Sequence, residues 1–155
     1  MASIRKATAE DAGGILACLS AAFAEYRDSY TSDAFTDTVL TTESLTRRLR
    51  ETTVFVATGR PGEIVGTIAC HIVNAQEGHI RGMAVLPDSR GTGIAARLLM
   101  QAQSHFREGN CKRISLDTTA PLVPAIRLYE RFGFVPSGKI QDFFGMPLME
   151  YVKTI

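Results

Sequence analysis

Residues 83–96 constrain the fold of this chain more than any other segment. They begin with the apolar run Met83–Val85, which is typical of a buried strand, and they end where an amphipathic helix begins after Gly91 and Gly93. Glycines let the backbone approach an anion without a Cβ in the way, and the unpaired N–H groups of a first helical turn bind phosphate. Arg90 adds a positive charge beside them. The segment therefore predicts a strand, a loop and a helix that bind a phosphate group.

These residues do not by themselves choose the phosphate ligand. Gly91, Gly93 and Ala96 also fit the G-x-G-x-x-A fingerprint of dinucleotide-binding folds, and Asp117 follows at a strand end. In such folds, however, the glycines follow the first strand directly, whereas here much of the chain precedes them and too little follows Asp117 for the remaining strands. A glycine turn that only caps a helix is a third explanation of the motif taken alone.

Hydrophobic periodicity along the whole chain predicts a mixed α/β (α+β) fold. The order βααβββαβαββ indicates one largely antiparallel sheet of about seven strands, with about four helices on its two faces. The expected strands are 3–6, 53–58, 64–73, 79–85, 112–118, 133–138 and 147–153, and the expected helices are 8–25, a second one around Leu45 and Leu49, 94–109 and 125–132.

Composition narrows the class of protein. The 155 residues are 45% hydrophobic and 21% charged, which suits one globular domain spanning residues 1–155. The net charge of +1 argues against a nucleic-acid partner. No stretch reads as a signal peptide or a membrane span, so we expect a cytoplasmic protein with no membrane partner. The cysteines and histidines follow no metal-ligand spacing, so we expect no metal.

Two motifs together resemble those of the GNAT superfamily of N-acetyltransferases. The segment that begins at Arg90 and contains Gly91 and Gly93 is similar to its (Q/R)-x-x-G-x-(G/A) motif, and residues 125–134 are similar to its second signature, A-x-x-L-Y-x-x-x-G-F. The two motifs have the expected separation, and the element order matches over nearly the whole chain. Residues 24–50 match only as a variable insert.

The resemblance implies transfer of an acetyl group from acetyl-CoA, as co-substrate, to a primary amine. By position, Tyr129 is the expected general acid and Asp117 a candidate general base, with Glu77 and His79 as alternatives. A backbone N–H of Met83 or Val85 would stabilise the oxyanion. Leu122 departs from the family pattern, in which many relatives have asparagine. The expected CoA-binding residues are Met83, Ala84, Val85, Arg90, Gly91, Thr92, Gly93, Ile94, Ala95, Ala96 and Ala125.

The acceptor is expected to be a small-molecule amine. Tyr26, Tyr30 and Phe35 lie among acidic residues in the variable segment and would favour a cationic or aromatic amine if that segment lines the acceptor channel. Acetylation of a protein N-terminus or lysine, and a non-catalytic acetyl-CoA sensor, remain as alternatives. The C-terminal strand PLMEYV, residues 147–152, would form a homodimer if it is an exposed edge.

Overall fold

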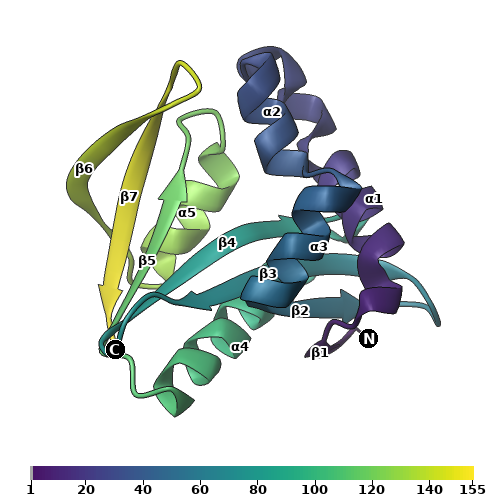
Figure 1. Ribbon diagram of the computed structural model, residues 1–155, viewed down its shortest axis with the longest axis horizontal. Helices are drawn as coiled ribbons and strands as arrows, with labels where there is room; N and C mark the ends of the chain where they lie inside the picture. The colour runs from purple at the N-terminus through teal and green to yellow at the C-terminus, as the bar shows by residue number, and fades with distance from the viewer. Residues whose placement is uncertain (1) are drawn as a thin grey trace.

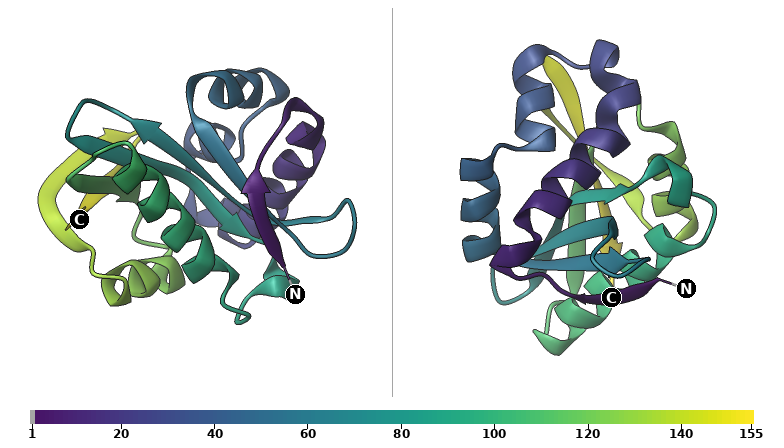
Figure 2. Two further views of the ribbon diagram at one scale, coloured as in Figure 1. Left: turned by 90° about the horizontal axis from the view of Figure 1, so that it is seen from below. Right: turned by 90° about the vertical axis from the view of Figure 1, so that its right-hand side faces the viewer.

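The computed structural model describes residues 2–155, which form a seven-stranded sheet with helices on both faces (Figures 1 and 2). The strand order is β1-β2-β3-β4-β5-β7-β6, and every neighbouring pair is antiparallel except β4 and β5. This confirms the mixed, largely antiparallel fold expected from the sequence. The strands are β1 (Ser3–Lys6), β2 (Thr53–Thr58), β3 (Ile64–Ile72), β4 (Glu77–Val85), β5 (Arg113–Thr118), β6 (Val135–Phe143) and β7 (Met146–Thr154).

Residues 2–155 contain five α-helices, where the sequence predicted about four. The extra helix lies in the variable segment, because the chain turns at Leu40, whose φ of 67° ends one helix, and Thr41 caps the next. Both helices are short, so their apolar periodicity is weak in the sequence. The helices are α1 (Ala12–Phe23), α2 (Ser32–Val39), α3 (Thr42–Glu51), α4 (Ile94–Glu108) and α5 (Val123–Arg131), and a 3-10 turn, η2 (Ala24–Ser29), follows α1. None of these helices is long and apolar enough to cross a membrane.

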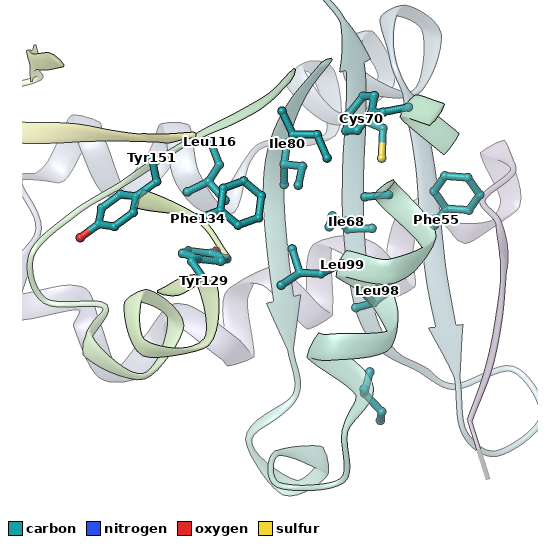
Figure 3. Close-up of a cluster of buried hydrophobic side chains, with 14 of the residues drawn as sticks. Phe55, Ile68, Cys70, Ile80, Leu98, Leu99, Leu116, Tyr129, Phe134 and Tyr151 are labelled. Carbon is teal, nitrogen blue, oxygen red and sulfur yellow. The ribbon is translucent and has the colours of Figure 1, made fainter. Parts of the chain in front are cut away.

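The sheet separates two hydrophobic clusters. Helices α1–α3 pack on one face and helices α4 and α5 on the other (Figure 2). Figure 3 shows the second cluster, in which Leu98 and Leu99 of α4 face Ile68 and Ile80 of the sheet. Burial of such side chains contributes about 1.5–3 kcal/mol each. The helices are therefore held at fixed positions against the strands that carry the site.

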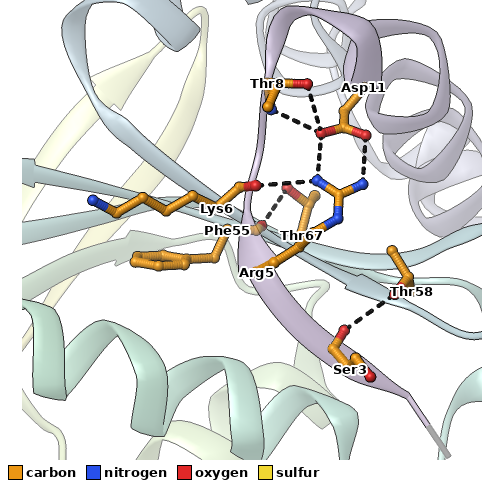
Figure 4. Close-up of polar contacts among 8 residues, drawn as sticks. All are labelled: Ser3, Arg5, Lys6, Thr8, Asp11, Phe55, Thr58 and Thr67. Carbon is orange, nitrogen blue, oxygen red and sulfur yellow. Dashed lines mark hydrogen bonds and ion pairs between the residues drawn. The ribbon is translucent and has the colours of Figure 1, made fainter.

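The edge strand β1 is tied to the start of α1 by a polar cluster (Figure 4). The Arg5 guanidinium donates to both carboxylate oxygens of Asp11, at 2.7 and 2.8 Å, and the Thr8 N–H donates to Asp11 Oδ2 at 2.8 Å. These contacts lower the pKa of Asp11 to about 2, with the hydrogen bond from Arg5 as the largest cause. Asp11 therefore closes the turn that precedes α1.

The C-terminal strand is not the sheet edge that the sequence suggested. Strand β7 pairs with β5 on one side and with β6 on the other, so its backbone hydrogen bonds are already made. The edge is β6 instead, because the chain reaches β7 through a hairpin that inserts it beside β5. The prediction that residues 147–152 form a homodimer as an exposed edge strand is therefore wrong.

The site is positioned where β4 and β5 separate. Their parallel pairing runs only from Glu77 and Arg113 to Ile80 and Leu116, although both strands continue. Beyond that point β4 contains a bulge at Gly82, whose φ is 54°, and the strands diverge with α5 beside the opening (Figure 1). A bulge increases local twist and bends the strand, and this opens the sheet.

Candidate active site

Two cavities meet at this opening. The larger one has a volume of about 530 Å³ and lies between the end of β4, the first turn of α4 and one side of α5. The smaller one, of about 310 Å³, lies towards α2, α3 and the β6–β7 hairpin. Both are lined by Phe23, Met83, Leu122 and Tyr129. A molecule in one cavity can therefore contact a molecule in the other beside Tyr129.

The glycine loop borders the larger cavity. Gly91 and Gly93 have φ angles of 77° and 83°, which side chains other than glycine rarely adopt. Among residues 2–155, no atom beyond their chain neighbours lies within 4 Å of a Cβ built on either glycine. The first α-helical hydrogen bond of α4 runs from the Arg97 N–H to the Gly93 carbonyl. The N–H groups of the preceding helical residues are therefore left for a phosphate.

Arg90 lies beside this loop but is already paired. Its guanidinium forms an ion pair with Glu25 of η2 and donates to the Ala22 carbonyl at 3.0 Å. These contacts tie the glycine loop to the end of α1. Arg90 could add charge to a bound phosphate only by sharing its hydrogen bonds with Glu25.

The end of β4 presents backbone groups to the larger cavity. The Leu86 N–H donates to the Val65 carbonyl of β3. Because successive strand residues alternate in direction, the N–H of Val85 faces the gap where β5 is no longer paired. Met83, beside the bulge at Gly82, lines both cavities. This edge therefore offers hydrogen-bond donors to an extended ligand.

Tyr129 projects from α5 to the junction of the cavities. Its side chain is only 7% exposed, and its ring packs edge-on against Phe134 at 6.1 Å (Figure 3). Burial, with a smaller effect of nearby Tyr30, raises the pKa of Tyr129 above its ordinary value. Within residues 2–155 its hydroxyl forms no hydrogen bond, so it is a protonated donor with no protein acceptor.

Asp117 ends β5 at the wall of the smaller cavity. Its Oδ2 lies 3.4 Å from His79 Nε2, and within residues 2–155 its buried Oδ1 has no hydrogen-bond partner. His79 Nδ1 is 2.7 Å from Ser115 Oγ, which donates to Glu77 Oε2 at 3.2 Å. Since the single Ser115 hydrogen goes to the carboxylate, His79 Nδ1 must donate to Ser115. Nε2 of a neutral His79 is then an acceptor, able to receive a proton that Asp117 has taken up.

The three candidates for the general base thus belong to one chain of polar contacts. It runs from Asp117 at the cavity through His79 and Ser115 to Glu77, which pairs with Arg113. Parallel pairing in register places His79 beside Ser115. The sequence named three of these residues as alternatives, and it gave no sign that they are neighbours across two strands.

The structure distributes the other predicted site residues unequally. Tyr30 lines the smaller cavity, where its hydroxyl hydrogen-bonds Thr119 Oγ1 at 2.7 Å, whereas Tyr26 lines the larger one. Phe35 is buried in the core beneath α2 and stacks edge-on against Tyr30. Thr92 is exposed, and its hydroxyl donates to the Ser89 carbonyl. The remaining expected cofactor residues line the larger cavity: Met83, Ala84, Val85, Arg90, Gly91, Gly93, Ile94, Ala95, Ala96 and Ala125.

Several lining residues were not found from the sequence. Arg48 reaches the smaller cavity from α3 and Arg81 from β4, and the Thr118 hydroxyl is buried there without a partner among residues 2–155. The sequence pattern did not single out Arg48, because it is one of several charged residues on a polar helix. Within the same residues, no cluster of three or more metal-ligand side chains occurs.

Comparison with models of known protein families identifies the family of this chain. The family model described as "Acetyltransferase (GNAT) family" matches residues 16–134. The chain belongs to the GNAT family of acetyltransferases. The resemblance inferred from the glycine loop and from the α5 signature is thereby confirmed.

Individual relatives are similar to different extents. An aminoglycoside N(6')-acetyltransferase type 1 of Stenotrophomonas maltophilia is 31% identical over 94% of this chain and 94% of that protein. The N-alpha-acetyltransferase MAK3 of Arabidopsis thaliana is 29% identical over 54% of this chain, and the match spans only 45% of its length. Among solved structures, the PaiA N-acetyltransferase of Thermoplasma acidophilum, in complex with coenzyme A, has a TM-score of 0.82 at 16% identity, covering 100% of this chain and 99% of that one.

Proposed function

We propose that the protein transfers the acetyl group of acetyl-CoA to a primary amine of a small molecule. The observation that carries this proposal is the position of the Tyr129 hydroxyl, a donor with no protein acceptor, where two cavities meet. The larger cavity suits CoA, because free backbone donors line it and the glycine loop leaves room for a pyrophosphate. The smaller cavity takes the acceptor. Membership of the GNAT family supports this division.

Each end of the reaction has a matching group. The amine nitrogen attacks the thioester carbon, so that a C–N bond forms and the C–S bond breaks. The sulfur leaves as a thiolate and takes a proton from Tyr129, whose raised pKa keeps it protonated at neutral pH. A backbone N–H of Val85 or Met83 stabilises the negative charge on the carbonyl oxygen of the tetrahedral intermediate.

The proton lost by the amine is accepted at Asp117. Its buried Oδ1 has no partner among residues 2–155, and an amine in the smaller cavity supplies the missing donor. The contact of Asp117 with His79 continues through Ser115 to Glu77. The proton can therefore pass along this chain to the beginning of β4, away from the thioester.

The shape of the smaller cavity favours a small molecule over a protein substrate. The Thr31 hydroxyl donates to the Phe144 carbonyl at 2.8 Å, which joins the start of α2 to the β6–β7 turn. Tyr30 is likewise joined to Thr119. Acetylation of a protein N-terminus or lysine requires an open groove, whereas these two contacts narrow the opening of the smaller cavity. Protein acetylation therefore stays the second candidate.

Calorimetric titration of acetyl-CoA, with NADH as the comparison ligand, tests the cofactor assignment. Binding of acetyl-CoA without binding of NADH supports the proposal. Binding of NADH without binding of acetyl-CoA refutes it and favours the dinucleotide-binding alternative.

Tyr129→Phe then separates an enzyme from a sensor. The variant should lose turnover by about 100-fold or more while it retains acetyl-CoA affinity. Tyr151→Phe is the matched control, because Tyr151 is equally buried, at 7% exposure, and lines neither cavity within residues 2–155. Full activity of Tyr129→Phe would exclude this tyrosine as the acid.

A further inference from the structure

Two arginines converge on the smaller cavity at the β4 bulge. Arg48 reaches it from α3 and Arg81 from β4 itself. A Cβ built on Gly82 would lie 2.4 Å from Arg48 Nη1, so the guanidinium lies directly against the bulge backbone. The bulge glycine therefore makes room for Arg48, because any side chain at position 82 would displace it.

The positive charge of Arg48 has no ion-pair partner among the residues that the structure describes. Within residues 2–155, neither Arg48 nor Arg81 forms an ion pair. Burial is the main cause that lowers the pKa of Arg48, and the positive charge of Arg81 adds to it, whereas Asp37 acts in the opposite direction. A half-buried guanidinium that stays charged is unfavourable without a partner. A bound anion would supply that partner.

The acidic residues around the cavity do not cancel this charge. Of the acids in the variable segment that suggested a cationic acceptor, only Asp37 lines the smaller cavity, and it is exposed. Glu25 is paired with Arg90 beside the larger cavity. Asp117 faces His79 on the β5 side. The cavity is therefore positive near α3 and offers a free carboxylate oxygen near β5.

We infer that the acceptor is a small amine that also carries a carboxylate, which Arg48 and Arg81 bind while the amine faces Asp117. This inference rests on the proposed acetyltransferase function. A cavity of about 310 Å³ is at the lower end of ligand sites, which suits an amino acid better than a large substrate. A polycation such as an aminoglycoside would bring like charges against both arginines.

The test compares acceptors that differ only in the carboxylate. Each common α-amino acid is assayed beside its methyl ester and its decarboxylated amine, with spermidine as a polycation, and thiol release is followed with acetyl-CoA. We expect at least one amino acid to exceed its ester about 10-fold or more in kcat/KM. Arg48→Gln should lower kcat/KM for the acid about 10- to 100-fold and leave that for the ester unchanged.

Matched variants separate charge recognition from folding. Arg47→Gln, which removes an exposed charge from the neighbouring position of α3, should leave both acceptors unchanged. Arg81→Gln removes the exposed member of the pair and should weaken the acid selectively. Acetyl-CoA affinity and circular dichroism check that Arg48→Gln is folded.

Three outcomes would overturn the inference. Esters, decarboxylated amines or spermidine could react as well as the acids or better. Folded Arg48→Gln and Arg81→Gln could affect acid and ester equally. Finally, the protein could fail to acetylate any amino acid with acetyl-CoA, and its CoA complex could fail to bind any amino acid in calorimetry. Acetyl transfer only to amines that lack a carboxylate would overturn this inference and leave the proposed acetyltransferase function unaffected. Failure to bind acetyl-CoA would remove both.

Discussion

Replacing Gly93 with alanine should weaken CoA binding far more than it weakens the fold. Gly93 has a φ of 83°, and an L-residue in this conformation costs about 1–2 kcal/mol, partly offset by about 0.4–1 kcal/mol from the less flexible unfolded chain. The added Cβ meets nothing within 4 Å among residues 2–155. We therefore expect a loss of about 1 kcal/mol in the free energy of unfolding, small beside the ordinary 5–15 kcal/mol.

Binding should respond differently, because the new methyl group occupies the space through which a pyrophosphate approaches the first turn of α4. Loss of one hydrogen bond to a charged phosphate corresponds to about 1.5–3 kcal/mol, or roughly 10- to 100-fold in Kd. Calorimetric titration of CoA measures this change, and urea unfolding measures the stability.

Gly62→Ala is the matched control for Gly93→Ala. Gly62 has a similar φ of 78° and the same open surroundings, but it lies in the β2–β3 turn and lines neither cavity within residues 2–155. Both variants should lose similar stability, and only Gly93→Ala should lose CoA affinity. Equal CoA affinities would refute the assignment of the glycine loop to the pyrophosphate.

Three further predictions concern the fold. Asp11→Asn should lower the free energy of unfolding by about 1 kcal/mol near neutral pH, after allowance for solvent screening. Because the pKa of Asp11 is depressed in the folded protein, the difference between variant and parent in urea unfolding should shrink as the pH falls from about 4 through about 2. A difference that does not change with pH would contradict this. Gly78→Ala should cost about 1–3 kcal/mol, since its Cβ would lie 2.2 Å from the fully buried Phe106 ring, and Phe106→Leu should relieve part of that cost in the double variant. The three cysteines are buried, and burial raises their pKa values, that of Cys70 to about 12. A thiol reagent at pH 8 should therefore label them only when the protein is unfolded in urea. Rapid labelling of the native protein would show that the cysteines are not packed as described.

The parts of the site that follow local rules were predictable. The positive φ angles of Gly91 and Gly93 are a property of single residues, and the apolar spacing of α4 is a property of one helix. The signature in residues 125–134 placed Tyr129 on a helix that ends at Arg131. These features needed no knowledge of distant neighbours.

The variable segment was less predictable because its helices are short and depend on tertiary contacts. Residues 24–50 showed one weak helical pattern, whereas the structure contains α2 and α3, broken at Leu40. The side chains of that segment also separate: Tyr26 lines the larger cavity, Tyr30 the smaller one, and Phe35 the core.

The sequence by itself determined the strand, loop and helix that suit a phosphate, the order of the elements apart from one helix of the variable segment, and the resemblance to the GNAT family. Each of these depends on residues that are close along the chain. Only the tertiary structure decided that β4 and β5 separate after Ile80, that His79 lies between Asp117 and Ser115, and that Arg48 lies on the Gly82 bulge. The physical reason is that parallel pairing and helix packing bring together residues far apart in sequence, and the charge of a cavity is set by which of them meet there.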